Sequence, residues 1–260
     1  MGKSRIGRSY GWRRNLPDPR NWRADIVMLA ARAVTIPDEV DLRPKDTPVY
    51  DQLTLGACTA NAAAGAMAFD MKQSGQEDHL HNPSRLFIYY NTRDIEDSIE
   101  TDSGASITDT MKAVQKYGAC EESLWPYDVA QFAARPTDAV YADAAEHTAP
   151  AYYAVDQTES AIELALAARF PVDFGMSVFD SFEGADVART GNVPNPDTAN
   201  ESMVGGHSML IVGYLRKTRL FIVRNSWGPS WGDAGYCYIP MKYLLNPDLA
   251  SDFQIIKVVS

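Results

Sequence analysis

The sequence predicts an α+β protein built from a mainly helical first half and an antiparallel β-sheet in the second half. Three segments between residues 51 and 118 are rich in helix-forming residues and carry start or end signals of helices. Four later runs are rich in Val, Ile, Phe and Tyr and are separated by turn residues. Helices that precede strands indicate two lobes, and a cleft between lobes is a favoured binding site.

The three helical segments follow one another closely. The first begins at Cys58 after a glycine-containing turn, continues through an alanine-rich stretch and is expected to end near Gly75, which suits a C-terminal cap. The second starts at an Asn-Pro pair and places Pro83 in its first turn. In the third, Ser106 is followed three residues later by an Asp, as in a capping box, and Gly118 ends the helix.

The second half changes to the composition of β-strands after one more helical stretch, ESAIELALAARF. Short runs of β-branched and aromatic residues alternate with Gly, Pro, Asn and Lys/Arg turns, which is typical of an antiparallel sheet. The predicted strands cover 171–179, 207–215, 220–227 and 235–241.

Composition and charge narrow the class of protein. The 260-residue chain is 45% hydrophobic, enough for a sizeable core, and has a formal net charge of -10, which argues against nucleic acid as its main partner. No apolar run reaches the length of a signal peptide or a membrane span. Its three cysteines are too few, and odd in number, to predict a disulfide framework. We therefore expect a cytoplasmic protein, with export by another route left open.

Residues 1–35 form a basic arm in front of an acidic domain at 36–260. The arm carries eight Lys or Arg against two Asp, a net charge of +6, which leaves -16 on the rest of the chain. It begins with a turn-rich, tryptophan-bearing stretch and continues with a short helical pattern at 23–34. Opposite charges in one chain favour docking of the arm on the domain and partial occlusion of its cleft. A solvated tail, or an arm for an acidic partner or a membrane surface, agrees equally well with these residues.

Cys58 lies where a thiol gains nucleophilic character. Unpaired backbone N–H groups and the positive end of the dipole at a helix start stabilise a thiolate and lower the cysteine pKa. The alternative is a small buried residue of an alanine-rich core helix, since free cysteine is among the most buried residue types.

His207 and Asn225 are the residues expected to act with Cys58. His207 opens a predicted strand after two glycines, 149 positions beyond Cys58, and Asn225 lies on the next strand. A hairpin centred between 216 and 217 sets position 207 opposite 225 or 226. An Asn carbonyl that accepts the imidazole N–H fixes the ring, as the third group of a Cys-His-Asn triad does.

These residues amount to a resemblance. From residue 36 onward the chain resembles the papain family of cysteine peptidases, on the stretches IPDEVDLRPKDTPVYDQLTLGAC, GGHSMLIVGY and VRNSWGPSWGDAGY. The third stretch, close to the family's Asn-Ser-Trp-Gly signature, is the most specific. The resemblance implies a papain-like fold of two lobes with the active-site cleft between them.

The resemblance implies a role for each catalytic position. Cys58 would be the nucleophile, His207 the acid and base, and Asn225 the residue that orients His207. Gln52, six residues before the nucleophile, would be the side-chain donor of the oxyanion hole. Trp227 would shield the Asn–His contact from water.

The resemblance also implies which residues line the cleft. Gly104 and Ala105 lie where the family has a glycine-containing wall, and the second subsite would be bounded by small residues. We therefore expect that pocket to be roomy and uncharged and to accept apolar side chains. The residues expected to bind substrate are Gly104, Ala105, Ser106, Gly175, Ser208 and Trp227.

The chain departs from the family pattern around the nucleophile and before it. LGACT replaces CGSCW, so that Leu55 and Thr59 stand where the family has a cysteine and a tryptophan. Leu55 excludes the family's disulfide at that point. The usual long inhibitory propeptide is also missing, and only the 35-residue arm precedes the start of the domain.

The sequence therefore predicts a papain-like thiol endopeptidase that acts on a protein or peptide substrate and needs neither a cofactor nor a metal. Two alternatives stay open. A Cys-His-Asn triad also serves an acyltransferase or a deamidase that acts on protein amides. The second alternative is that the chain is not an enzyme but a binding module whose triad performs no catalysis. Cys120 and Cys237 are predicted to be unbonded structural thiols.

Overall fold

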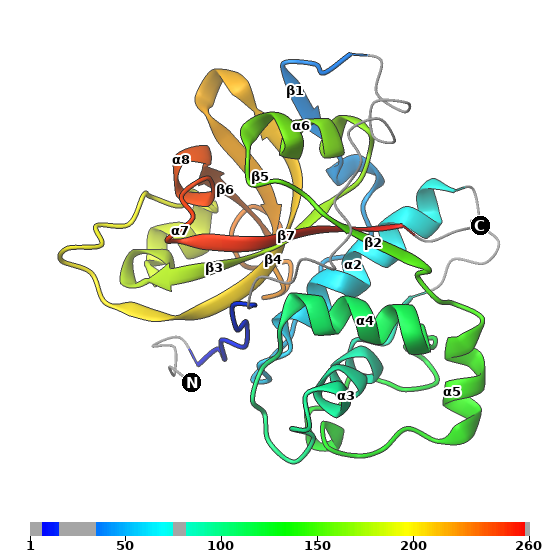
Figure 1. Cartoon of the computed structure of the whole chain (residues 1–260). Coiled ribbons are helices and arrows are strands. Elements are labelled where there is room, and N and C mark those ends of the chain that lie inside the picture. Colours follow the sequence, from blue (N-terminus) through cyan, green and yellow to red (C-terminus); the bar gives the residue numbers. More distant parts are fainter. Residues whose placement is uncertain (1–6, 16–34, 75–81, 258–260) are drawn as a thin grey trace.

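Helix α2 (Cys58–Gln73) runs through the middle of the molecule, between a helical lobe and a sheet lobe (Figure 1). The computed structural model describes residues 7–15, 35–74 and 82–257. Every residue of α2 from Cys58 to Met71 is buried. The run of small alanines explains this, because both lobes can approach its backbone closely. The two-lobed α+β architecture predicted from the sequence is confirmed.

The helical lobe consists of short, capped helices. The helix expected to begin at Pro83 begins two residues later, because the Ser84 hydroxyl accepts the Phe87 N–H and makes Ser84 the N-cap. The cap at Ser106 and the end at Gly118 (φ +73°) are as predicted, whereas α2 ends at Gln73 and Gly75 lies outside the described residues. The lobe contains α3 (Arg85–Ile95), α4 (Ile107–Tyr117), η3 (Val129–Gln131) and α5 (Asp138–Ala145).

The described residues of the second lobe form a seven-stranded antiparallel sheet in the order β2-β7-β3-β4-β5-β6, with β1 added on β4. The four predicted runs form β3 to β6, and the predicted helix before them is α6 (Glu159–Ala167). The other three strands were not predicted. The strands are β1 (Glu39–Asp41), β2 (Ala151–Ala154), β3 (Val172–Phe179), β4 (Met203–Leu215), β5 (Leu220–Arg224), β6 (Tyr236–Pro240) and β7 (Ala250–Lys257).

The predicted register of the β4–β5 hairpin was wrong by one to two residues. The pairing joins Leu210 to Arg224, and an irregularity between Ile211 and Gly213 shifts it by one residue toward the turn. The cause lies in the turn, where η5 (Arg216–Thr218) and a left-handed residue close the hairpin. Strand β5 ends at Arg224, so Asn225 has no partner residue on β4.

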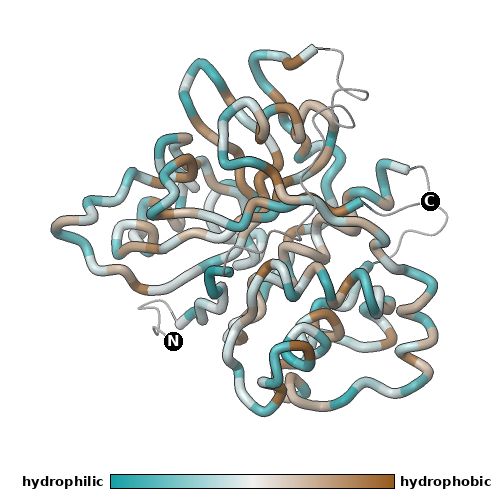
Figure 2. Tube along the Cα trace, in the orientation of Figure 1, coloured by the Kyte–Doolittle hydropathy of each residue, from teal (hydrophilic) through white to brown (hydrophobic). Residues whose placement is uncertain are grey.

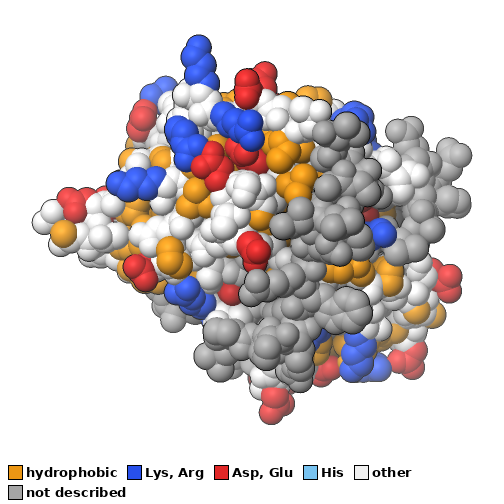
Figure 3. All heavy atoms as spheres, turned by 45° about the horizontal axis from the view of Figure 1, so that its top comes forward, with side chains coloured by type: hydrophobic (Ala, Val, Ile, Leu, Met, Phe, Trp, Pro, Cys, Tyr) orange, Lys and Arg blue, Asp and Glu red, His pale blue; other side chains and the backbone are white. Residues whose placement is uncertain are grey.

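The core joins both lobes, and the surface is charged. Hydrophobic residues concentrate along the central strands and the inner helices (Figure 2). On the face shown in Figure 3, basic and acidic side chains are interspersed. Ion pairs of the sheet lobe include Arg216–Glu163 and Arg219–Glu159. Within the described ranges, no helix combines the length and the apolar character needed to cross a bilayer. Short elements complete the fold: η1 (Arg43–Lys45), η4 (Asp180–Glu183), α7 (Ala185–Thr190) and α8 (Met241–Leu244).

Candidate active site

Cys58 is the first residue of α2 and is fully buried. Burial raises the pKa of its thiol to about 11, although backbone N–H groups of Ser208, Gly11 and Thr59 donate toward the sulfur and oppose this rise. The expectation of a lowered pKa therefore does not hold for this conformation. The physical reason is that residues 7–15, which include Gly11, cover the sulfur and exclude the water that a thiolate needs.

His207 on β4 contacts Asn225, which follows β5. The distance from His207 Nε2 to Asn225 Oδ1 is 2.8 Å, and the Ser226 N–H donates to the same oxygen at 2.8 Å. Because that atom accepts two hydrogen bonds it is the amide oxygen, so Nε2 of His207 carries the proton. His207 Nδ1 makes no hydrogen bond and is left as a free base. Burial lowers the pKa of His207 to about 4, so that the ring is neutral here.

Trp227 covers the imidazole. Its ring stacks on that of His207, with the ring centres 5.2 Å apart and the planes at 29°. Phe182 and Trp231 pack edge-on against Trp227 in turn. This aromatic layer covers the imidazole of His207. The shielding of the His207–Asn225 hydrogen bond from water by Trp227 stays a prediction.

Gln52 is held in one orientation, with its amide N–H₂ toward Leu55 and Ser9. Ser226 Oγ donates to Gln52 Oε1 at 2.6 Å, which fixes the orientation of the amide. Gln52 Nε2 then donates to the carbonyl oxygens of Leu55 (2.8 Å) and Ser9 (3.1 Å). Sequence reasoning missed Ser226. Its place directly after the triad Asn, within the Asn-Ser-Trp-Gly stretch, was the only signal that pointed to it.

Residues 7–15, which we call the docked segment, lie where the two lobes meet, drawn in dark blue in Figure 1. The backbone of the segment pairs with both sides of the site. The Ala105 N–H donates to the Gly11 carbonyl (2.7 Å), and the Arg13 N–H donates to the Ala105 carbonyl (3.1 Å). On the other side, the Trp12 N–H donates to the Gly206 carbonyl at 2.9 Å. The segment thus bridges the helical lobe and strand β4 directly over Cys58.

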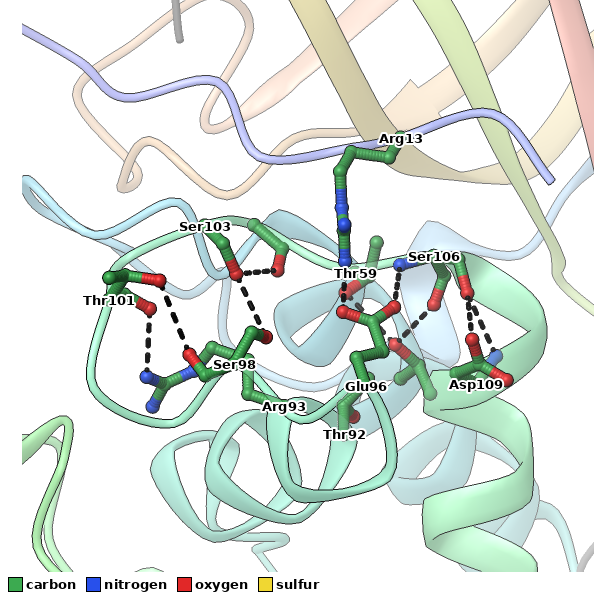
Figure 4. A network of polar contacts seen from close by, with 12 residues as sticks. Arg13, Thr59, Thr92, Arg93, Glu96, Ser98, Thr101, Ser103, Ser106 and Asp109 are labelled. Carbon is green, nitrogen blue, oxygen red and sulfur yellow. Dashed lines mark hydrogen bonds and ion pairs between the residues drawn. The ribbon is translucent and has the colours of Figure 1, made fainter.

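The two ends of the docked segment are joined to the domain by charge. Arg8 forms an ion pair with Asp51 and donates to the Trp227 carbonyl at 3.1 Å. Arg13 reaches the carboxylate of Glu96, which also accepts the Ser106 N–H at 2.8 Å (Figure 4). Both contacts join a basic residue of the arm to an acidic residue of the domain, as the net charges of +6 and -16 led us to expect.

Between these ends, Tyr10 packs on the imidazole. Its ring lies edge-on to His207, with the ring centres 5.8 Å apart, and its hydroxyl donates to Glu183 at 2.7 Å. Tyr10 is almost completely buried. An apolar ring over His207 removes water from the imidazole, which favours the neutral ring.

Five of the six residues expected to bind substrate fall into two groups, and the sixth, Trp227, stacks on His207. Gly104, Ala105 and Gly175 lie against the docked segment. The hydroxyls of Ser106 and Ser208 are already engaged, because Ser106 caps α4 and donates to Asp109, and Ser208 donates to Asp173 at 2.8 Å. The backbone N–H of Ser208 faces the Cys58 sulfur, whereas that of Ser106 donates to Glu96.

Cys120 and Cys237 are free and buried, as predicted. Burial raises the pKa of the Cys120 thiol to about 12 and raises the pKa of Cys237 further. Both thiols are therefore protonated and inert near neutral pH.

The carboxylate of Asp102 connects the turn before Cys58 to the loop that carries Gly104. In the family pattern, a disulfide-forming cysteine stands in this turn, at the position of Leu55. Asp102 accepts the Gly56 N–H at 3.0 and 3.1 Å and the Tyr89 hydroxyl at 2.5 Å. The Tyr89 oxygen in turn accepts the Gly104 N–H at 3.2 Å. Asp102 was not singled out from the sequence, because nothing in the local pattern shows that it reaches Gly56, 46 positions away.

Several known proteins are similar to this chain. The model of the papain family cysteine protease matches residues 36–250. An uncharacterized peptidase C1-like protein of Acanthamoeba polyphaga mimivirus is 38% identical to this chain, and the alignment covers 100% of this chain and 90% of the viral protein. Procathepsin L of Felis catus is 27% identical over 81% of this chain and 62% of its own length.

Solved structures are similar over nearly the whole chain. Xylellain, a cysteine protease from Xylella fastidiosa, matches with a TM-score of 0.89 and 37% identity, and 96% of each chain is covered. Digestive procathepsin L 3 of Tenebrio molitor matches with a TM-score of 0.71 at 21% identity, over 91% of this chain and 74% of its own. At that identity the second match shows the fold alone.

Proposed function

Because this chain belongs to the papain family of cysteine proteases, we propose that it is an endopeptidase that acts through a Cys58-His207-Asn225 triad and an acyl-enzyme. The observation that carries the proposal is the 2.8 Å contact between His207 Nε2 and Asn225 Oδ1, which leaves Nδ1 as the basic nitrogen. A neutral imidazole with a free Nδ1 is the form that takes a proton from a thiol.

The proposed reaction uses these residues in sequence. His207 takes the thiol proton, and the Cys58 thiolate attacks the carbonyl carbon of the peptide. Gln52 Nε2 and the Cys58 N–H stabilise the negative charge on the carbonyl oxygen, where one such donor is worth about 3 kcal/mol. The imidazolium then protonates the leaving amine, and the acyl-enzyme is hydrolysed by a water that His207 deprotonates.

We also propose that the docked segment restrains this activity. Its Ser9 carbonyl accepts the Gln52 N–H that the oxyanion needs, and its Gly11 N–H faces the sulfur. An N–H group offers no electrophilic carbon to the thiol, so the segment occupies the site without presenting a bond for cleavage at that point. Burial beneath the segment also favours the neutral thiol and imidazole over their charged forms.

Covalent labelling tests the triad. An epoxysuccinyl electrophile should modify Cys58 alone once the segment is displaced, and a fluorogenic peptide should be cleaved at an internal bond. Absence of both labelling and cleavage would favour a binding module. Release of an amine without chain scission would favour the deamidase alternative.

Truncation of the chain and high salt test whether the docked segment restrains the activity. Removal of residues 1–35 should raise turnover of a small peptide or, if the segment supports the core, lower the thermal stability. High salt should weaken the restraint, because the Arg8–Asp51 and Arg13–Glu96 contacts are partly exposed and therefore screened. Unchanged kinetics and stability, with rapid proteolytic loss of the segment from the intact protein, would exclude the restraint.

A further inference from the structure

Arg85, the first residue of α3, packs against the rings of two tyrosines. Its guanidinium carbon is 4.6 Å from the centre of the Tyr50 ring and 4.1 Å from the centre of the Tyr127 ring. Arg85 is buried and forms an ion pair with Glu122. Two cation–π contacts and an ion pair hold the planar guanidinium group in one orientation, so that its remaining N–H donors point in fixed directions.

Arg85 and Tyr127 bind two consecutive backbone carbonyls of the stretch that carries Gln52. Arg85 Nη1 donates to the Asp51 carbonyl at 3.1 Å, and the Tyr127 hydroxyl donates to the Gln52 carbonyl at 2.9 Å. On the other side of the same residue, the Gln52 N–H donates to the Ser226 carbonyl at 2.8 Å. The backbone of Gln52 is thus held by the helical lobe and by the stretch that follows β5.

The chain just before Gln52 is also fixed from the sheet lobe, by Arg224 of β5. The guanidinium carbon of Arg224 is 5.0 Å from the centre of the Tyr50 ring, and its Nη atoms donate to the carbonyls of Thr47 (2.8 Å) and Pro48 (2.6 Å). Tyr50 therefore contacts one guanidinium group from each lobe. The donors and rings of this arrangement all belong to the domain, so these contacts do not depend on the docked segment.

We propose that Arg85 and Tyr127 are positioning residues of the oxyanion hole, which fix the backbone at Gln52 so that its amide is in place before a substrate binds. The inference rests on the proposed peptidase function. A donor in a fixed position stabilises the developing oxyanion without reorganisation, and a displacement of about 1 Å costs about a hundredfold in rate. Ser226 Oγ orients the Gln52 amide, whereas Arg85 and Tyr127 set where the Gln52 backbone lies.

Two reactions of Cys58 separate this role from a merely structural one. Alkylation by iodoacetamide displaces iodide from carbon and develops no oxyanion, whereas peptide hydrolysis needs the oxyanion hole. A positioning residue of the hole should therefore affect hydrolysis alone. Both rates are measured in the full chain with Gly11→Ala, because a methyl group on Gly11 would overlap the Gly56 carbonyl and displace the docked segment.

Tyr127→Phe removes the hydroxyl and keeps the ring beside Arg85. We expect kcat for a fluorogenic peptide to fall about tenfold, with KM and the alkylation rate of Cys58 each changed less than about twofold. Arg85→Lys keeps the positive charge but loses the planar fork, and it should show the same pattern. Tyr141→Phe is the matched control, because the Tyr141 hydroxyl donates to Asn91 at 2.8 Å instead, and it should leave kcat unchanged.

A double variant shows whether Tyr127 acts through Gln52. Once Gln52→Ala has removed the amide, Tyr127→Phe should cause no further loss of kcat. Unchanged kcat in Tyr127→Phe, losses that add in the double variant, or an equal fall of alkylation and hydrolysis would overturn the inference while the peptidase function stands. Alkylation of Cys58 without cleavage of any peptide by the Gly11→Ala chain would overturn the proposed function, and this inference with it.

Discussion

Gly11 and Gly56 touch backbone to backbone, so closely that a methyl group on Gly11 would overlap the carbonyl oxygen of Gly56. On the opposite side, a Cβ on Gly104 would overlap the Gly11 carbonyl. Three glycines thus meet beside Cys58, where the docked segment crosses from one lobe to the other. The position of the docked segment over Cys58 therefore depends on the absence of side chains at Gly11 and Gly104.

Gly11→Ala should therefore displace the docked segment and raise the initial rate of peptide turnover. The added methyl group has no room, and backbone on backbone cannot relax as a flexible side chain does. Arg14→Ala is the control in the same segment, because the Arg14 side chain is exposed and donates to the Pro247 carbonyl, not to the residues around Gly11. The rate is measured with a small fluorogenic peptide. Equal rates in Gly11→Ala and the parent would contradict a restraining role.

Substitutions in the triad should abolish turnover without unfolding the protein. When each substitution is combined with Gly11→Ala, Cys58→Ala and His207→Ala should each lower kcat by about four orders of magnitude or more. Asn225→Ala should lower kcat less, because the orientation of His207 accounts for only part of the lowering of the activation barrier. The Cys120→Ala variant should stay active, and it serves as the control for the removal of a buried thiol outside the site. Circular dichroism checks the fold, and turnover above background in Cys58→Ala would refute the triad.

The oxyanion hole should respond to Ser226 as well as to Gln52. Gln52→Ala removes the side-chain donor and should lower kcat about 10²–10³-fold with little change in KM. Ser226→Ala leaves the donor in place but frees its amide to rotate, so a smaller loss in kcat is expected. In the double variant the losses should not add, because Ser226 acts through Gln52. Additive losses would show that Ser226 acts independently.

The pH dependence of thiol alkylation should report the state of the docked segment. With a Cys58 pKa of about 11, the reactive thiolate is a minor species at neutral pH, and its fraction rises tenfold with each pH unit. In the parent, the alkylation rate of Cys58 by iodoacetamide should therefore keep rising from pH 6 to 9. In Gly11→Ala the burial is relieved, the thiol pKa falls, and the rate should level off within that range.

Mass spectrometry of the Cys58 peptide measures this rate, and Cys120 and Cys237 serve as internal controls that stay unmodified in the folded protein. Identical profiles for the parent and Gly11→Ala would mean that the segment does not control the thiol.

Asp102→Ala should lower both stability and activity. It leaves the Gly56 N–H and the Tyr89 hydroxyl without their acceptor, at a cost of about 1–3 kcal/mol for each buried group. Because Gly56 precedes the nucleophile by two residues, kcat should fall together with the thermal midpoint. Asp138→Ala, at an exposed helix start, is the control. A lowered midpoint with unchanged kcat would limit Asp102 to a structural role.

Local patterns were enough to predict much of the fold. Helix caps at Ser106 and Gly118 and the four central strands depend on residues within a few positions of one another, so their signals stand in the sequence itself. Strands β2 and β7 were missed because they gain stability from each other, about 100 positions apart, rather than from local composition.

The sequence by itself determined which residues meet in the site, because a hairpin brings His207 to Asn225 even when its register is displaced by a residue. Only the tertiary structure decided the state of that site. The Cys58 pKa depends on how much water reaches the sulfur, and this is set by Gly11, which lies 47 positions earlier and carries no local sign of its destination. Asp252 likewise meets Trp12, 240 positions earlier, only because β7 pairs with β3. Burial and charge depend on long-range packing, which periodicity and spacing along the chain do not encode.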